Sequence, residues 1–423
     1  MIKQKLLKLK EEALSYDPSM RLFILAAMVC AFCISSEYGI TRPASNAIFI
    51  SNFSTKAFPY AWLATVPLNF LLVYLYNRML PLLGCLKTLL SIIVAVLTVN
   101  TLTSFFVKSI PELSFFHYIW KDLYILLMFK QLWSLIHSTI DTSRAKYLYG
   151  ILFGIGGFGS IMGSLIPGFL AVHVGSERLF LFTIPLYITL YFFYSIALKQ
   201  SKLKKGFSDQ FKKIKAADSP LKRIFQKRYL TYILLLVVFM QMSVAFTDYQ
   251  FNTYLEKNIL DLDLKTQFCG RVISIINMLT TSFQFLGGFL LIHFMGLKKS
   301  HRLVPLLLCS NALVFLFMPT FGMITFSFIF IKSMDHSFFG IIREMLYIPV
   351  GQEEKFRVKA IIDVFAYRTA KAIASAFLLF FQYVTFVEPV LIVSILSFII
   401  FGLWTLIITG LFRERENLTL QVN

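Results

Sequence analysis

The sequence has few charged residues for its length. Lys, Arg, Asp and Glu make up 15% of its 423 residues, whereas soluble domains carry about 25%. Hydrophobic residues make up 57% and gather in long uninterrupted runs. A helical run of about 20 residues matches the hydrocarbon layer of a bilayer, roughly 30 Å thick. Because a soluble fold cannot bury a dozen such runs, the composition excludes an ordinary soluble domain and predicts an all-α polytopic membrane protein.

Motifs that carry chemistry are also missing. No GxxxxGK(S/T) segment is present, which argues against an ATP-driven pump. The six histidines are scattered without ligand spacing. We see no catalytic constellation and therefore expect neither an enzyme, nor a metal site, nor a cofactor. No cleavable signal peptide is evident, because the first apolar run is too long and follows a basic amphipathic segment.

Two short patterns look like known sites. Cys30 and Cys33 have CxxC spacing, but they lie in the first apolar run without a second pair. We predict that these and the other three cysteines are small buried residues. The glycines from Gly154 to Gly159 match GxGxxG, yet no strand precedes them as a dinucleotide site requires. Since they continue to Gly163 and Gly168, we expect close helix packing instead.

Hydropathy divides the chain into twelve apolar spans, six on each side of a basic stretch. That stretch, 199–228, contains eleven Lys or Arg residues and two aspartates. Nucleic-acid surfaces interleave aromatics with basic residues, so we interpret it as a cytoplasmic loop with no nucleic-acid partner. The expected organisation is a cytoplasmic segment over 1–21, six-helix bundles over 22–198 and 229–412, the loop between them, and a tail over 413–423. The expected spans are Leu22–Ile50, Phe58–Leu80, Leu86–Val107, Phe115–Ile140, Tyr147–Val174, Leu179–Leu198, Tyr229–Phe251, Phe268–Met295, Leu303–Phe321, Ile324–Ile348, Val358–Phe386 and Val390–Phe412.

The short loops predict the orientation. Basic residues fall on the side of the two termini, whereas the opposite loops carry Glu112, Glu256, Asp261, Asp263 and Glu388. Under the positive-inside rule both termini are cytoplasmic. We expect a monomer, surrounded by lipid, in the inner (plasma) membrane of the cell.

An internal repeat relates the two halves. The stretch KQLWSLIHSTIDTSRAKYLYG from Lys130 aligns with REMLYIPVGQEEKFRVKAIID from Arg343 at an offset of 213 positions. The Arg-x-Lys pair at Arg144 and Lys146 recurs at Arg357 and Lys359. Two six-helix pseudo-repeats with a long central loop form the major-facilitator arrangement, in which substrate binds between the halves near the midplane.

Ionisable groups inside apolar spans are costly and are normally paired or face a wet cavity. Twelve such groups predict a polar cavity that recognises charge. They are Glu37, Arg42, Lys130, Asp248, Arg271, Lys332, Asp335, Arg343, Glu344, Asp363, Arg368 and Lys371.

The local pattern suggests roles for some of these groups. Lys332 and Asp335 are three residues apart, so they can neutralise one another on one helix face. Pro43 is expected to break the first helix and to leave Arg42 in a cavity. A second set lies toward the cytoplasmic side, where we expect structural or gating salt bridges; it comprises Arg144, Lys146, Arg343, Glu344, Arg357, Lys359, Asp363 and Arg368.

Four segments resemble the non-mitochondrial ATP/ADP translocase family of plastids and obligate intracellular bacteria, together with its broader bacterial relatives. They are YGITRPASNAIFISNFSTKAFPYAW, DTSRAKYLYGILFGIGGFGSIMGSLI, FTDYQFNTYLEK and REMLYIPVGQEEKFRVKAIIDVFAYRTAKAIASAF. The resemblance runs in order from Leu22 to Leu379. It implies a nucleotide transporter of the major-facilitator fold that exchanges ATP for ADP, imports nucleotides with protons or carries a related anion.

The resemblance also implies a set of substrate-binding charges. A lysine and an aspartate of helix one fall on Ser45 and Asn46, and a glutamate of helix four falls on Gln131, next to Lys130. The acid of helix seven matches Asp248, and the lysine of helix eleven matches Lys371. Asp248 and Lys371 thus keep their charges, whereas the other positions carry neutral groups.

The working hypothesis is a secondary transporter that works by alternating access on a nucleotide-like anion. Arg42 and Lys371 would attract the anion, and Asp248 would couple its movement by taking a proton or by pairing with one of these cations. Two alternatives stay open. One is a proton-coupled carrier of an unrelated metabolite or drug, and the other is a non-transporting membrane scaffold.

Overall fold

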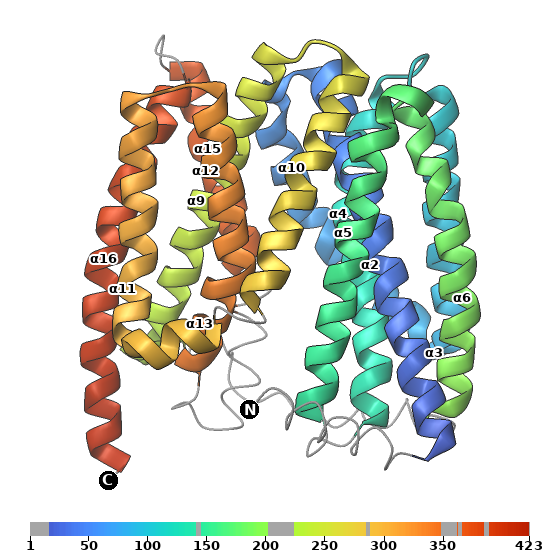
Figure 1. Ribbon diagram of the computed structural model, residues 1–423, viewed down its shortest axis with the longest axis horizontal. Helices are drawn as coiled ribbons and strands as arrows, with labels where there is room; N and C mark the ends of the chain where they lie inside the picture. The colour runs from blue at the N-terminus through green and yellow to red at the C-terminus, as the bar shows by residue number, and fades with distance from the viewer. Residues whose placement is uncertain are drawn as a thin grey trace. The chain divides into compact units, whose positions relative to one another are not determined.

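The computed structural model describes residues 17–140, 145–201, 224–284, 288–347, 362, 366–384 and 389–422. These residues are almost entirely helical and include no strand (Figure 1). The expected all-α class is therefore confirmed for the described part of the chain. The helices group into two compact units, each of which is described by itself.

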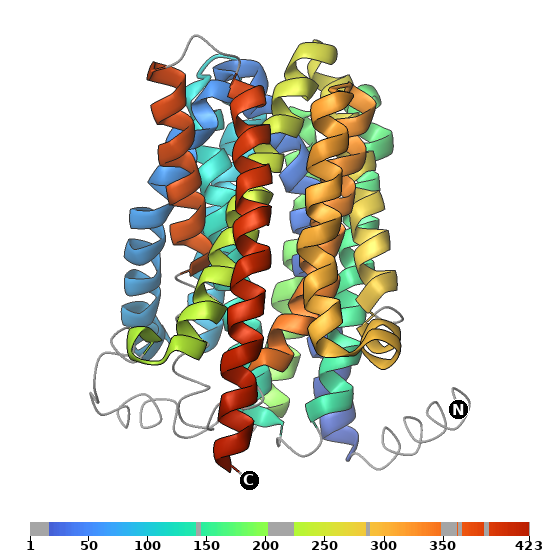
Figure 2. The ribbon, with the colours of Figure 1, turned by 90° about the vertical axis from the view of Figure 1, so that its left-hand side faces the viewer.

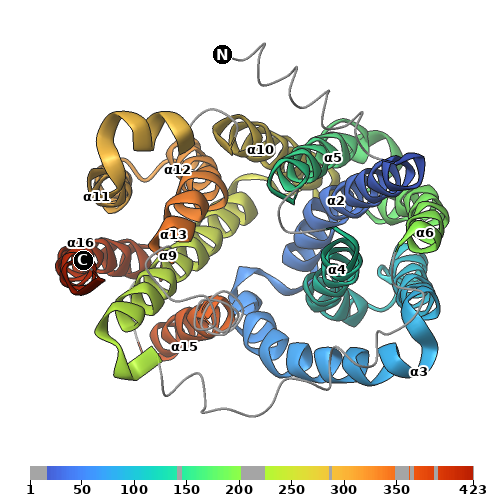
Figure 3. The same ribbon diagram turned by 90° about the horizontal axis from the view of Figure 1, so that it is seen from below.

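Unit 1 combines Met1–Asn52 and Leu68–Lys215 with Asp261–Ser274. The central helix α2 packs on α4, α5 and α6 (Figure 3). Phe23, Cys30 and Tyr124 belong to the fully buried hydrophobic core that these helices enclose. The helical elements of this unit are α2 (Pro18–Phe53), most of α3 (Phe58–Phe106), α4 (Glu112–Thr139), α5 (Ala145–Val174), the 3₁₀ segment η2 (Glu177–Phe182), α6 (Thr183–Gln200) and the start of α10 (Leu262–Ser282).

Unit 2 combines Phe53–Pro67 and Ala216–Leu260 with Ile275–Asn423. Its central helix is α9, which contacts α12, α15 and α16. Figure 2 shows α16 as one long helix that ends near the C-terminus. The helical elements of this unit are η1 (Thr55–Ala57), the start of α3, α9 (Arg228–Asn258), the end of α10, α11 (Gly288–Phe317), α12 (Phe321–Met334), the π-helical turn η5 (Asp335–Phe339), α13 (Gly340–Leu346), α15 (Tyr367–Val384) and α16 (Pro389–Val422).

Six helical stretches of the described chain are long and apolar enough to cross a membrane. The segment Thr55–Phe106 is 52 residues long and covers two of the expected spans. The other five are Pro18–Phe53, Gly150–Val174, Glu177–Gln200, Arg228–Asn258 and Leu391–Glu414.

Two glycines bend the long helices in the same way. Gly84 in α3 has φ 75° and ψ 169°, and Gly296 in α11 has φ 70° and ψ 164°. Residues with a side chain almost never adopt this conformation. Each glycine lies at a junction where hydropathy places a loop between two spans, and the two are 212 positions apart.

The first helix does not break at Pro43. The prediction was wrong: α2 continues through this residue to Phe53. A proline inside a membrane helix removes one backbone hydrogen bond, but tertiary packing can hold the helix together. Pro43 has no N–H to donate to the carbonyl of Gly39. The backbone of Gly39 packs closely against the backbone of Ser160 and Ser164 in α5.

The small residues of α5 allow close backbone contacts, as predicted. A Cβ atom built on Gly163 would lie 2.1 Å from the carbonyl oxygen of Ser36 in α2, and one on Gly159 would lie 2.6 Å from that of Phe32. Farther along α5, a Cβ atom on Gly270 of α10 would lie 2.4 Å from the backbone nitrogen of Gly168. The glycine-rich segment is thus a helix-packing surface.

The cysteine prediction holds for three of the five residues. Cys30, Cys33 and Cys269 are buried, whereas Cys85 and Cys309 are half-buried, and all five thiols are free. The described residues contain no group of three His, Cys, Asp or Glu side chains that could hold a metal ion.

Candidate functional site

An ion pair joins α9 and α12 of unit 2. Lys332 Nζ donates a hydrogen bond to Asp248 Oδ2 at 2.7 Å. The lysine side chain is 5% exposed and that of Asp248 is 16% exposed. We expected Lys332 to neutralise Asp335 on its own helix, and that expectation was wrong. Instead, the acid that pairs with this ammonium group comes from α9.

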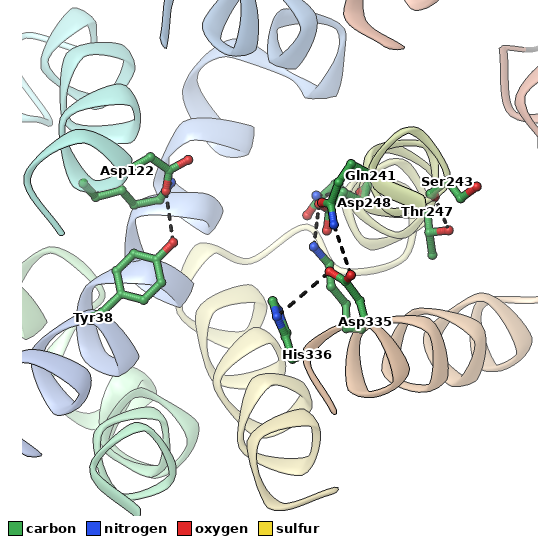
Figure 4. Close-up of polar contacts among 11 residues, drawn as sticks. Tyr38, Asp122, Gln241, Ser243, Thr247, Asp248, Asp335 and His336 are labelled. Carbon is green, nitrogen blue, oxygen red and sulfur yellow. Dashed lines mark hydrogen bonds and ion pairs between the residues drawn. The ribbon is translucent and has the colours of Figure 1, made fainter. Parts of the chain in front are cut away.

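Asp335 has neutral and weakly basic partners instead. Gln241 Nε2 of α9 donates to Asp335 Oδ1 at 3.1 Å, and His336 Nδ1 lies 4.0 Å from Oδ2 (Figure 4). Asp335 begins the π-helical turn η5. Turns of this kind interrupt the regular i→i−4 pattern and are frequent at functional sites. Asp248, Lys332 and Asp335 therefore form an acid–base–acid set on two facing helices.

Lys371 of α15 lies over an aromatic ring. Its Nζ is 4.8 Å from the centroid of the Trp62 ring, at the start of α3. The Trp62 side chain is 1% exposed and its ring stacks on Phe58 at 5.7 Å. A buried indole face stabilises a cation without neutralising its charge. The Trp62 ring can therefore stabilise the Lys371 ammonium group.

Arg42 belongs to a polar cluster between α2 and α4 of unit 1. Its guanidinium lies 5.9 Å from the centroid of the Tyr38 ring. Tyr38 donates a hydrogen bond to Asp122 Oδ1 at 3.0 Å (Figure 4), and Lys121 Nζ lies 3.2 Å from the same oxygen. Lys121 also lies 3.7 Å above the ring of Tyr118. Arg42 is half-buried.

Ser45 and Asn46, where the resemblance implies charges in related proteins, both have partners inside unit 1. The Ser45 hydroxyl is 3.0 Å from His117 Nδ1 of α4, and both residues are buried. The Asn46 side chain lies next to the Cys269 thiol of α10. Neither position adds a charge to the cluster around Arg42.

Gln131 and Lys130 contact different neighbours. Gln131 is buried, accepts a hydrogen bond from the Tyr76 hydroxyl, and donates to the Cys85 carbonyl and the Tyr194 hydroxyl at 2.9 Å each. The amide nitrogen and the amide oxygen of Gln131 are therefore both engaged in hydrogen bonds. Lys130 is half-buried, donates to Asn77 Oδ1 at 2.9 Å and lies 4.7 Å from the centroid of the Tyr76 ring.

Most of the expected gating charges lie outside the described residues. The guanidinium of Arg343 in α13 is 5.9 Å from the centroid of the Phe339 ring, and Glu344 is exposed. The positions of Arg144, Arg357, Lys359 and Asp363 and the side chains of Lys146 and Arg368 are not among those described.

A small cavity inside unit 2 has a polar but uncharged lining. It lies between α9, α11, α12 and α16 and is lined mainly by Thr247, Gln250, Ser327, Ser394 and Ser397 among its polar residues. Gln250 Nε2 donates to Ser394 Oγ at 2.7 Å. A lining without charge suits water or a neutral group better than a phosphate.

Several engaged residues were not singled out from the sequence. His117, Lys121 and Asp122 lie on one stretch of α4, and Gln241 lies two turns before Asp248 on α9. Their polarity inside apolar spans was the available indication. Their partners come from distant helices and are not visible in local sequence.

Comparison with known proteins identifies the family. Residues 179–414 match the sequence model of the family described as TLC ATP/ADP transporter. The match covers more than half of the chain and includes Asp248, Lys332 and Lys371. The chain belongs to the TLC ATP/ADP transporter family. It is therefore a membrane transporter and not an enzyme.

A curated relative agrees with this assignment. ADP,ATP carrier protein 1 of Rickettsia bellii is 22% identical to the chain over 338 residues, which are 70% of this chain and 67% of the carrier. The alignment thus spans about two thirds of each protein.

Solved structures support the fold. The chain is similar to a bacterial homologue of the iron transporter ferroportin in an inward-facing state, with a TM-score of 0.65, 12% identity, and coverage of 90% of this chain and 98% of that one. It is also similar to the POT family transporter PepTSo (TM-score 0.63, 11% identity, 94% and 98% covered) and to the nucleoside transporter NupG (0.57, 12%, 94% and 99%). This TLC family member therefore has the fold of major-facilitator-type transporters.

Proposed function

We propose that this protein is a secondary transporter of a nucleotide or a related organic anion, which works by alternating access through exchange or proton coupling. The observation that carries the proposal is the placement of Lys332 and Lys371. Both are cations on helices of unit 2 inside the region that matches the TLC family. Buried charges are expensive in a membrane protein, and they typically mark a substrate or ion pathway.

Lys332 is proposed to exchange partners during transport. Without substrate its ammonium group is neutralised by Asp248 at 2.7 Å. A phosphate or carboxylate oxygen that approaches Lys332 competes with Asp248 for the same donor. Asp248 then carries an uncompensated charge, which favours protonation or a new arrangement of α9 and α12. Asp248 is the coupling acid of the working hypothesis. Its proposed partner is thus Lys332, and not Arg42 or Lys371.

Lys371 is proposed to bind the anion directly. The Trp62 ring stabilises the ammonium group through its face and does not itself neutralise the charge. Arg42 would contribute the cation of unit 1 and Lys130 would assist it. Because Ser45 and Gln131 supply no charge, we infer a substrate that carries less negative charge than a triphosphate.

The proposed topology has twelve spans in two six-helix pseudo-repeats. The equivalent bends at Gly84 and Gly296 support the duplication, because the same rare backbone conformation occurs at corresponding junctions. We propose a monomer in the inner membrane, surrounded by lipid, with both termini in the cytoplasm in accordance with the positive-inside rule.

Uptake into proteoliposomes tests the proposal. Purified protein is reconstituted and labelled ATP, ADP and AMP are offered outside, with and without unlabelled nucleotide inside. The proposal predicts saturable uptake that nucleotides inhibit. Solute uptake that follows a pH gradient but is not inhibited by nucleotides would favour a carrier of an unrelated metabolite. The scaffold alternative is favoured if no solute is transported and if the protein tolerates the neutralisation of Asp248 and Lys371 together.

A further inference from the structure

A buried carboxyl group lies at the centre of unit 1, away from the charges discussed above. Glu37 of α2 is 1% exposed. Its Oε1 accepts hydrogen bonds from the Tyr124 hydroxyl of α4 at 2.6 Å and from the Thr41 hydroxyl at 2.8 Å. The side chain is thus fixed in a polar pocket within an otherwise apolar core.

No cation compensates this carboxyl group among the described residues. The titratable groups that face it are the hydroxyls of Tyr124 on α4 and Tyr187 on α6. The nearest charged residues of α4, Lys121 and Asp122, pair with each other at 3.2 Å. An isolated carboxylate in an apolar medium is so costly that the group normally takes up a proton instead.

The second carboxyl oxygen has room for that proton. Glu37 Oε2 and the neighbouring Tyr187 hydroxyl are both buried, and neither has a hydrogen-bond partner of ordinary geometry. A proton on Oε2 gives the carboxyl a donor that the Tyr187 oxygen can accept. Protonation therefore satisfies two buried polar atoms and removes the charge at the same time.

A row of polar side chains leads from Glu37 along α2. Thr41 and Ser45 follow Glu37 at intervals of four residues, which places them on one face of the helix. Ser45 contacts His117, whose Nε2 lies 3.1 Å from Asn100 Oδ1. All these side chains are buried.

The hydrogen bonds of this row determine the state of His117. The Thr183 hydroxyl donates to the Phe180 carbonyl and accepts from Asn100 Nδ2 at 3.2 Å. The Asn100 oxygen therefore accepts from His117 Nε2, and His117 Nδ1 is left to accept from the Ser45 hydroxyl. A neutral imidazole between the Ser45 hydroxyl of α2 and the Asn100 amide of α3 is able to receive a proton on one nitrogen and release one from the other.

We propose that Glu37 is a proton-binding site of this carrier, reached through the row of Thr41, Ser45 and His117. In the described state Oε2 holds the proton and the carboxyl is neutral. During the transport cycle the proton passes to water on one side of the membrane and is replaced from water on the other, so that the carboxyl gains and loses one negative charge. This inference rests on the proposed function, because it assigns proton coupling rather than strict exchange to the nucleotide carrier.

Proton-driven accumulation in proteoliposomes tests the site. Glu37→Gln keeps the acceptor oxygen, and its amide donates where the protonated Oε2 would. We expect the variant to retain exchange of labelled for unlabelled nucleotide but to lose the accumulation that a pH gradient drives. Tyr124→Phe is the matched control, since it removes one hydrogen bond to Glu37 Oε1 and leaves both the carboxyl and the row of Thr41, Ser45 and His117, and it should still accumulate nucleotide. Accumulation by Glu37→Gln at the wild-type level would overturn the proposal.

A second measurement needs no substrate. If Glu37 binds a proton in the folded protein, unfolding releases that proton. The free energy of unfolding then falls as pH rises. The melting temperature of the wild type should therefore decrease relative to that of Glu37→Gln with increasing pH, and parallel curves would refute the site. Divergent curves in a protein that moves no nucleotide would overturn only the proposed function. Parallel curves in an active nucleotide exchanger would overturn only the proton site.

Discussion

Lys332 Nζ on α12 lies 2.7 Å from Asp248 Oδ2 on α9. The pair gives a direct way to separate a structural role from a transport role, because its charges can be exchanged between the helices. In the combined variant Asp248→Lys with Lys332→Asp, an ion pair can form again. A purely structural pair would then preserve transport.

We expect the exchanged pair to fold but not to transport. The cation now stands on α9 and no longer where Lys332 meets the substrate, so uptake should be lost while the melting temperature stays close to that of the wild type. Lys332→Ala alone should cost about 3 kcal/mol of stability, at the low end for breaking a buried pair, since the Asp248 side chain is still 16% exposed. Uptake by the exchanged variant at the wild-type rate would assign the pair to structure alone.

The second prediction concerns the ring beneath Lys371. Trp62→Leu removes the aromatic face that lies 4.8 Å from Lys371 Nζ, whereas Trp62→Phe keeps one. A cation–π contact contributes about 0.5–2 kcal/mol. We therefore expect KM for the anion to rise by up to about thirtyfold in the leucine variant and by less in the phenylalanine variant. Equal KM values in the wild type and both variants would show that Trp62 does not position the cation.

The third prediction concerns the contact of α2 with α5. Gly163→Ala places a methyl group 2.1 Å from the Ser36 carbonyl oxygen, and the helices must separate to admit it. Overpacking of this kind costs about 1–3 kcal/mol, which should lower the melting temperature of the purified protein.

Gly150→Ala is the matched control on the same helix. No atom lies within 4 Å of the added methyl group, so the melting temperature should stay the same or rise slightly. Equal losses in the two variants would show that α2 and α5 do not meet closely at Gly163.

The fourth prediction concerns the two bends. Alanine at Gly84 or Gly296 must adopt φ near +75° or +70°, a conformation that costs about 1–3 kcal/mol for a residue with a side chain. Each variant should therefore melt earlier than the wild type, by similar amounts. Gly322→Ala in α12 has open space and an ordinary φ, and it should melt like the wild type. A normal melting temperature for Gly84→Ala would show that α3 does not bend there.

Hydropathy alone predicted where most helices of unit 1 lie. The spans Leu22–Ile50 and Phe115–Ile140 correspond closely to α2 and α4, because burial in lipid depends on local composition. Local rules failed where tertiary contacts compensate. Pro43 was expected to end the first helix, yet α2 continues through it, with Gly39 packed closely against α5.

Side-chain partners were the least predictable feature. The spacing of Lys332 and Asp335 suggested a pair within one helix, but the lysine pairs with an acid 84 positions away in the chain. The resemblance drew attention to Ser45 as the position of a missing charge. It could not indicate that the Ser45 hydroxyl is hydrogen-bonded to His117. A scattered histidine carries no information about its neighbours until the helices are placed.

The most direct test of nucleotide transport is the initial rate of labelled nucleotide uptake into proteoliposomes, compared among Lys332→Met, Lys371→Met and Lys108→Met. Lys108 is the control cation, because its side chain is 79% exposed and its contact with Glu177 Oε1 spans 3.5 Å. We predict saturable uptake by the wild type and the Lys108 variant, and loss of uptake in folded Lys332 and Lys371 variants. Undiminished uptake in both of these variants, or no nucleotide uptake by the wild type, would contradict the proposal.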